Sequence, residues 1–454
     1  MVRRLVVGIA TIGCLLLAPA VGYASWSAPQ RVSATGENLD EPRIVSDHAG
    51  DSVILWIRHL PKEREIVEAV TKPAGGAWSS AVGLGSGHPD PQPEVAIDSS
   101  GEATVVWTGS RRAGKRVLET TYARSHPAHG GWGPPVALST SNIRTNEGRV
   151  GEAQIALDRR GDATVVFDAR SRDGKEMVQF SIRPRGGRWS APRTSAVAAK
   201  DGSVGQPQVA MDDRGETLIA WSAFEQIQVV MLGRGGRPLG ATQTVGEIGG
   251  YPLRLTANAK GDALLTWAPE ATGGSPVEIS TRRAGGRFTG AVNITPAAWR
   301  SRPAVTAIDE DGNATVLFTR NGAGDRGFGA HEIVQIADHP AGGHWSKPRP
   351  LPGAIPPNGL WSEEPAITLG PDGEMISAWV VLTPESGEPG GSESLRIEAS
   401  VRPTGSQWQP PTLVAFNGAY APVLAFSTST TVTAAWIHHE AASSFIETDT
   451  YQLG

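Results

Sequence analysis

The residues of this chain that are best suited to bind a ligand lie outside its regular strand-like segments. Trp299 and Trp361 stand in two such irregular segments, with arginine or glutamate residues close by. An indole stacks on a sugar ring or a peptide, and charged neighbours add hydrogen bonds to the ligand. The alternative is that both indoles cover the ends of the hydrophobic core. The predicted ligand site comprises Tyr251, Trp299, Arg300, Arg302, Trp361, Glu363, Glu364 and Tyr420.

A second set of polar residues stands at the start of strand-like segments. Glu41, Gln92 and Gln206 each precede a proline directly, and Glu152 occupies the equivalent place before an alanine. A ring of such oxygens would hold waters, a cation or a hydroxylated ligand, or would simply be solvated. Glycoside hydrolysis requires a pair of carboxylates, for which Glu41 and Glu364 are candidates.

Motifs for metal, thiol or serine chemistry are lacking or have a structural explanation. Residues 309–313 (DEDGN) lack the later glutamate of a calcium loop, and residues 438–440 (HHE) lack the spacing of a zinc-binding helix. Residues 160–162 (RGD) fall in a predicted turn. The single cysteine, Cys14, lies in a segment that we expect to be removed. We therefore predict no metal site and no cofactor.

A unit of roughly fifty residues recurs along the chain and must position all of these side chains. Nine residues before an aromatic residue most units carry Asp, and six residues before it they carry Gly. An Asp-x-x-Gly segment forms a tight turn, because the Asp side chain accepts turn amides and Gly takes the left-handed conformation. The aromatic residue recurs at Trp56, Trp107, Phe167, Trp221, Trp267, Phe318, Trp379 and Trp436.

Each unit is predicted to form four antiparallel strands, and eight units predict an all-β, eight-bladed β-propeller; seven blades are the alternative. The last unit lacks its fourth strand, and residues 26–33 match one. Pairing the two ends removes both exposed strand edges. The first and third turns of every unit would lie on one face. The other face, called the loop face below, would carry the connections of unequal length and thus the function.

The N-terminus has the pattern of a secretory signal peptide. Arg3 and Arg4 precede an apolar run from Leu5 to Leu17, and Gly22 and Ala24 are small residues suited to a cleavage site. We predict a signal peptide over residues 1–24, a single propeller domain over 25–454, and a secreted, extracellular protein without a membrane span in the mature chain.

Composition limits the classes of partner. Hydrophobic residues make up 39% and charged residues 19% of the chain, which suits a packed core. The net charge is −5 and no long basic run occurs, which argues against binding to nucleic acid. We expect a monomer.

The unit resembles the secreted bacterial propellers grouped with the sialidase-like (BNR-type) repeat proteins. The likeness is carried by residues 93–107 (PEVAIDSSGEATVVW) and their repeats, covers nearly the whole mature chain, and implies a propeller. The family's Asp box, Ser-x-Asp-x-Gly-x-Thr-Trp, is not found, so no catalytic residue is transferred. We therefore expect a non-catalytic binding or scaffold protein for an extracellular carbohydrate or protein ligand. The alternative is a sialidase-like glycoside hydrolase acting at the mouth of the central channel.

Overall fold

The computed structural model contains only β-strands as regular elements within the residues that it describes. The predicted signal peptide, Gln92, Glu152 and Tyr251 lie outside those residues. The described residues are 26–34, 38–61, 64–87, 93–113, 116–144, 153–171, 174–199, 202–247, 253–269, 275–297, 299–321, 332–355, 361–384, 393–440 and 443–453.

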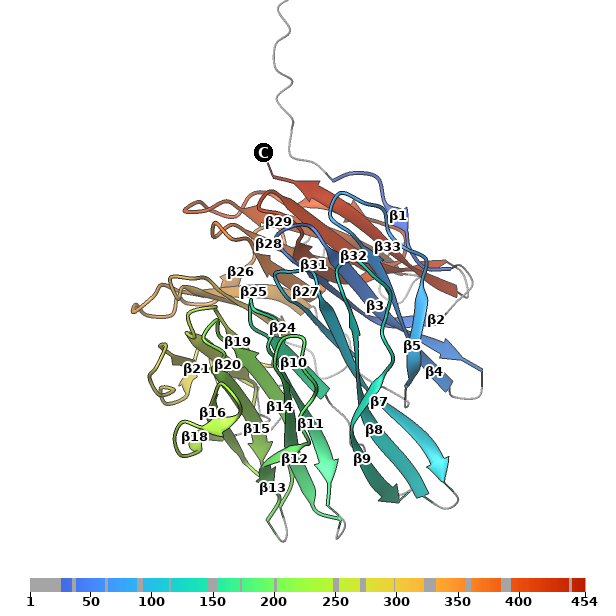
Figure 1. Cartoon of the computed structure of the whole chain (residues 1–454). Helices are drawn as coiled ribbons and strands as arrows, with labels where there is room; N and C mark the ends of the chain where they lie inside the picture. Colours follow the sequence, from blue (N-terminus) through green and yellow to red (C-terminus); the bar gives the residue numbers. More distant parts are fainter. Residues whose placement is uncertain are drawn as a thin grey trace, which may run out of the picture.

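The strands form eight antiparallel sheets, or blades, that are arranged in a ring (Figure 1). Blade 1 contains β2 (Asn38–Ser46), β3 (Ser52–Leu60), β4 (Arg64–Lys72) and β5 (Val82–Gly87). Blade 2 contains β6 (Glu94–Ile97), β7 (Ala103–Ala113), β8 (Arg116–His126) and β9 (Val136–Arg144). Blade 3 contains β10 (Ala153–Leu157), β11 (Ala163–Arg170), β12 (Glu176–Arg183) and β13 (Arg193–Val197). Blade 4 contains β14 (Val204–Met211), β15 (Thr217–Ala223), β16 (Gln226–Gly233) and an outer strand split into β17 (Arg237–Pro238) and β18 (Gln243–Glu247).

The second half of the ring repeats this order. Blade 5 contains β19 (Arg254–Ala257), β20 (Ala263–Trp267), β21 (Glu278–Arg282) and β22 (Val292–Asn293). Blade 6 contains β23 (Ser301–Ile308), β24 (Ala314–Asn321), β25 (Glu332–His339) and β26 (Arg349–Pro350). Blade 7 contains β27 (Trp361–Leu369), β28 (Met375–Pro384), β29 (Glu393–Arg402) and β30 (Thr412–Ala415). Blade 8 contains β31 (Ala419–Phe426), β32 (Thr431–Glu440), β33 (Ser443–Gln452) and β1 (Gln30–Arg31).

The first strands of consecutive blades contact one another all the way around, including β31 with β2, so the ring is closed and these strands form its inner wall. The prediction of an eight-bladed propeller is confirmed, and the seven-bladed alternative is wrong.

The Asp-x-x-Gly turns form as predicted. The Asp47 carboxylate accepts backbone N–H groups from Ala49, Gly50 and Asp51 at 2.9–3.0 Å. Glycine is required at Gly101 for two reasons: its φ is +78°, and a Cβ there would lie 2.5 Å from the carboxylate of Asp51 in the preceding blade. The turn therefore sets both the hairpin and the distance between neighbouring blades.

The core lies between blades rather than inside one blade. The second-strand aromatic residues are at most 1% exposed and pack in clusters that combine two neighbouring blades. Just before the outer strand, a tryptophan contacts a side chain six residues earlier in the chain, which shields the outer end of the core. These pairs are Lys72–Trp78, His126–Trp132, Arg183–Trp189, His339–Trp345 and Arg402–Trp408.

The start of the described chain completes the last blade, as predicted. Strand β1 pairs with β33, with Gln30 opposite Thr448. The pairing continues on both sides, because Trp26 bridges to Tyr451 with ring centroids 5.1 Å apart and Val32 N donates to Ile446 O at 3.0 Å. Without this segment, β33 would be an open edge strand.

Removal of residues 26–34 should therefore lower the melting temperature by several degrees and promote aggregation. A synthetic peptide of that sequence, added in trans, should restore part of the loss by pairing with β33. A peptide carrying Trp26→Ala should restore less, because it lacks the contact with Tyr451. Differential scanning calorimetry measures the melting temperature of the shortened chain alone, with the peptide and with the Trp26→Ala peptide. Equal melting temperatures for the full and shortened chains would contradict closure by β1.

Candidate functional site

The inner strand of several blades is irregular where it enters from the loop face. In β2, β14, β27 and β31 the pairing register shifts near the start of the strand, which is a β-bulge. One residue of each bulge has a left-handed backbone and directly precedes a proline. These residues are Glu41 (φ 50°), Gln206 (φ 53°), Glu364 (φ 49°) and Ala421 (φ 51°).

This conformation is strained for any residue other than glycine. A left-handed φ costs about 1–3 kcal/mol per residue and persists only where the surrounding structure enforces it. Such strain and such bulges gather at functional sites, because they aim a side chain in a direction that a regular strand cannot give.

The bulge side chains connect neighbouring blades. The Glu364 carboxylate accepts the backbone N–H of Ala421 at 2.8 Å, and the Gln206 side-chain oxygen accepts that of Leu253 at 3.4 Å. Gln206, one of the four residues of the polar ring predicted from the sequence, thus has a structural role. Ligand binding by this ring stays a prediction.

Three consecutive blades give the ring its asymmetry. Blades 7, 8 and 1 present Glu364, Ala421 and Glu41 at the same bulged position, and their inner strands β27, β31 and β2 contact one another in that order. The side chain between the two glutamates is therefore a single methyl group. These three strands follow one another around the ring (Figure 1), although β2 lies far from the other two in the sequence.

Tyr420 and Asp40 place further titratable groups beside Glu364. Burial, and then the negative charges of Asp40 and Glu364, raise the pKa of Tyr420 to about 12. Although Glu364 remains accessible to solvent, burial also raises its pKa; the amide of Ala421 acts against this shift, and Asp40 adds to it. The Tyr420 phenol is therefore a neutral donor, and Glu364 keeps its proton to a higher pH than an ordinary glutamate.

Glu41 has the opposite kind of neighbour. The Arg43 guanidinium lies 3.4 Å from the carboxylate of Glu41 and 3.4 Å from that of Glu94 in blade 2. Burial opposes the positive charge of Arg43, but the two carboxylates outweigh it and raise its pKa. The two glutamates that flank Ala421 thus lie in contrasting surroundings, which is the arrangement that separates an acid from a base in hydrolases.

A histidine completes this sector, which we call the Glu364–Glu41 site. The imidazole of His439, at the end of β32, stacks on Tyr420 with ring centroids 5.3 Å apart. Its backbone N–H donates to Gly418 O at 2.9 Å, which ties the end of β32 to the entry of β31. The site comprises Asp40, Glu41, Arg43, Glu364, Tyr420, Ala421 and His439.

The structure divides the ligand site that the sequence predicted. It brings Glu364 and Tyr420 together and places the half-buried Glu363 beside them in β27. Trp361 belongs to β27 by its backbone, its side chain is not among those described, and Tyr251 lies outside the described residues.

The remaining predicted residues lie at blades 5 and 6. Trp299 is half-buried, packs on the core between these blades and is covered by the Arg320 guanidinium at 3.8 Å from its ring centroid. Arg300 and Arg302 are exposed, and Arg302 lies 3.9 Å from the Glu332 carboxylate. Trp299 therefore covers the core, which is the alternative considered for it, and it also lines the groove described below. Ligand binding by Trp299 stays a prediction.

Sequence reasoning missed Asp40, Arg43 and His439. The first two flank Glu41, and the spacing of the repeat could have found Arg43, because it stands thirteen residues before Trp56 just as Glu94 stands thirteen before Trp107. His439 was considered only as part of a metal motif. Within the described ranges, no group of three His, Cys, Asp or Glu side chains is arranged to hold a metal ion. The same residues contain no helix long and apolar enough to cross a membrane.

Solved structures with a similar course of the chain exist, whereas neither a protein-family model nor a curated protein matches the sequence. An ulvan lyase, described as a new family of polysaccharide lyase, superposes with a TM-score of 0.49 at 11% identity over 93% of this chain and 95% of its own. An α-L-arabinofuranosidase of Fusarium graminearum, solved with arabinobiose, has a TM-score of 0.39 at 10% identity over 80% and 92%. A protein of unknown function from Dyadobacter fermentans has a TM-score of 0.44 at 11% identity over 95% and 99%.

The expectation of a non-catalytic binding or scaffold protein is corrected by this comparison. The similar structures with a named activity include polysaccharide lyases and glycoside hydrolases, which agrees better with the alternative, a glycoside hydrolase. At these identities and TM-scores the likeness carries no argument about residues. Their roles are therefore derived below from this chain alone.

The raised pKa of Glu364 predicts a pH-dependent stability difference for Glu364→Gln. The folded state binds the proton of Glu364 more tightly than the unfolded state does. Protonated Glu364 therefore stabilises the fold fully below the ordinary glutamate pKa, and this stabilisation is lost as pH rises through the raised pKa of the folded state. The variant cannot ionise, so it should melt at the same temperature as wild type at pH 4 and at a higher temperature at pH 8. The exposed Glu440 supplies a Glu→Gln control that should show no such divergence. If the melting temperatures of Glu364→Gln and wild type changed in parallel with pH, the raised pKa of Glu364 would be contradicted.

Proposed function

We propose that this protein is a secreted glycoside hydrolase that cleaves an extracellular carbohydrate at the Glu364–Glu41 site. The observation that carries the proposal is the pair of glutamates at the same strained position on either side of Ala421, one with a raised pKa and the other paired with Arg43. Two carboxylates in contrasting surroundings are the minimum equipment for hydrolysis of a glycosidic bond.

Glu364 is assigned as the general acid. Its raised pKa keeps the proton to a higher pH than an ordinary glutamate would, and this proton passes to the oxygen of the departing sugar as the glycosidic bond breaks. Glu41 is assigned as the charged carboxylate, which stabilises the positive charge that develops on the sugar ring. It then attacks the anomeric carbon or removes a proton from the attacking water.

The other residues of the site are assigned to positioning. The neutral phenol of Tyr420 donates a hydrogen bond to a sugar hydroxyl, and His439 holds the phenol ring by stacking. The methyl group of Ala421 leaves room for the sugar ring between the glutamates. Arg43 acts through Glu41 and holds its charge.

Secretion belongs to this proposal as well. Arg3, Arg4 and the apolar run from Leu5 to Leu17 support a signal peptide, and an extracellular glycan is a substrate that a secreted monomer would meet. The likeness to sialidase-like propellers is retained as a proposal about architecture only.

Loss of either glutamate should abolish most of the activity. Glu364→Gln and Glu41→Gln should each lower kcat/KM by about 10²–10⁴-fold, the range that general acid–base groups contribute. Gln206→Ala, which changes the same bulged position in blade 4, is the matched control and should retain wild-type turnover. The measurement is release of reducing sugar from a panel of neutral and anionic polysaccharides.

The pH profile and the products test the assigned roles. The alkaline limb of the wild-type kcat/KM profile should report Glu364 and disappear in Glu364→Gln. Unsaturated sugar products would show elimination instead of hydrolysis, and undiminished turnover in both glutamate variants would contradict the proposal.

A further inference from the structure

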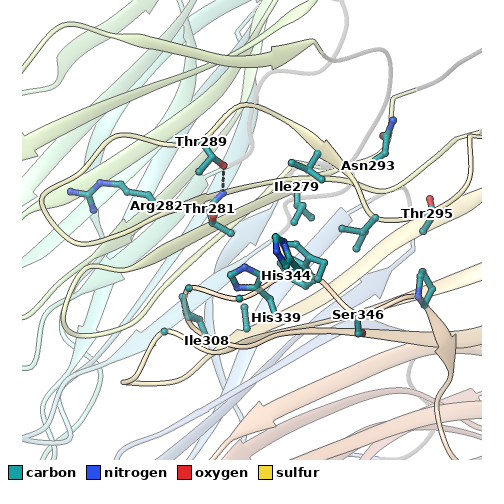
Figure 2. Close-up of a pocket in the computed structure, with 18 of the residues that line it drawn as sticks. Ile279, Thr281, Arg282, Thr289, Asn293, Thr295, Ile308, His339, His344 and Ser346 are labelled. Atoms are coloured by element: carbon teal, nitrogen blue, oxygen red, sulfur yellow. Dashed lines mark hydrogen bonds between the residues drawn. The ribbon is translucent and has the colours of Figure 1, made fainter.

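A groove of about 970 Å³ runs between blades 5 and 6, away from the Glu364–Glu41 site (Figure 2). At the outer edge of blade 5, strand β22 has two residues and pairs only with Glu278 and Ile279 of β21, and both β22 residues line the groove. The volume is near the upper end of the range for small-molecule sites and is sufficient for more than one sugar ring.

Aromatic groups line one part of this groove. Trp345 of blade 6 contacts His339 with ring centroids 4.9 Å apart, and Trp299 lines the same groove from the loop face. Burial lowers the pKa of His339, so its imidazole is neutral at physiological pH. Trp408, which holds the place of Trp345 in blade 7, is only 7% exposed, whereas Trp345 is half-buried and borders the groove.

Hydroxyl, amide and imidazole groups line the rest. Figure 2 shows side chains from both walls of the groove, with Thr281, Thr289 and Asn293 on blade 5 and His339, His344 and Ser346 on blade 6. All six carry groups that form hydrogen bonds, and the three on blade 5 lie around the apolar side chain of Ile279. A surface that alternates rings and small polar groups matches the apolar faces and the hydroxyl edges of a sugar chain.

The charged lining residues are mostly satisfied within the protein. Asp262 accepts the backbone N–H of Ala284 at 2.9 Å and lies 3.4 Å from the Arg283 guanidinium. Arg282 points away from the groove and donates to Gly261 O at 2.6 Å. Lys347 is the exposed charge that remains at the rim among the described lining residues. The groove therefore offers few charged side chains to bind a charged ligand.

We propose that the groove between blades 5 and 6 is a second carbohydrate-binding site, which holds a neutral glycan chain without cleaving it. The ligand class follows from the lining of the groove. The role of the groove in holding the substrate polymer close to the Glu364–Glu41 site rests on the proposed function.

Affinity electrophoresis in gels containing xylan, starch or laminarin, with alginate and heparin as anionic probes, tests the proposal. The protein carries Glu364→Gln in every lane, so that turnover does not interfere. At least one neutral polysaccharide should retard it. Trp345→Leu, which keeps the apolar packing but removes the stacking surface, should weaken this retardation about tenfold, equivalent to about 1.4 kcal/mol. His344→Ala, an exposed position, should weaken it without a change in melting temperature.

The control is Trp189→Leu, the equivalent tryptophan of blade 3. Equal retardation of the Trp345 and Trp189 variants, no retardation by any neutral polysaccharide, or retardation by the anionic ones alone would overturn the proposal. A short soluble glycoside should be hydrolysed at the same rate by the wild-type protein and by Trp345→Leu. If neither protein hydrolysed any such glycoside, the proposed hydrolase activity would be contradicted, and the result on the groove would be unaffected.

Discussion

The antiparallel pairing of β1 with β33 is the constraint on which the rest of the structure depends. It joins the first described residues to the last strand and brings blade 8 against blade 1. Glu41 and Glu364 come from opposite ends of the chain, and they flank Ala421 only because the ring is closed. A linear array of the same blades would leave Arg43 and Glu41 on one terminal blade and Glu364 on a distant one. Closure is thus a requirement for the site as well as for stability.

Within the closed ring, the proposed site is built from departures from the repeat. Each turn of Asp-x-x-Gly type repeats the same hydrogen bonds, and the second-strand aromatic residues are buried in every blade. The inner-strand bulges carry Glu in blades 1 and 7, Gln in blade 4 and Ala in blade 8. The backbone strain is common to these four positions, whereas the side chain decides the chemistry. A rigid scaffold with one variable position per blade is a simple way to build an asymmetric site.

Most of the fold could be predicted from the sequence, because its signals are local and repeated. The aromatic spacing indicated eight blades, and the Trp26 segment indicated how the ring closes. The site was harder, because its neighbours are set by ring closure and by side-chain direction. Asp40 and Arg43 carried no motif, and His439 drew attention only as part of residues 438–440. The groove beside Trp299 is lined by residues of two blades, and the packing of one blade against the next leaves no clear mark in the sequence. The expectation of a non-catalytic scaffold relied on the regular repeats, the aromatic residues outside them and the lack of known catalytic motifs, and carboxylates that lie on different blades form no such motif.

The central claim is that a sugar is held between Glu41 and Glu364 above Ala421. A crystal structure of the Glu364→Gln variant, soaked with an oligosaccharide of the most strongly bound polysaccharide, tests this most directly. We expect density for a sugar ring over Ala421, with its glycosidic oxygen next to the amide of residue 364 and its anomeric carbon facing Glu41. Sugar found only between blades 5 and 6, or on the face opposite the loop face, would contradict it.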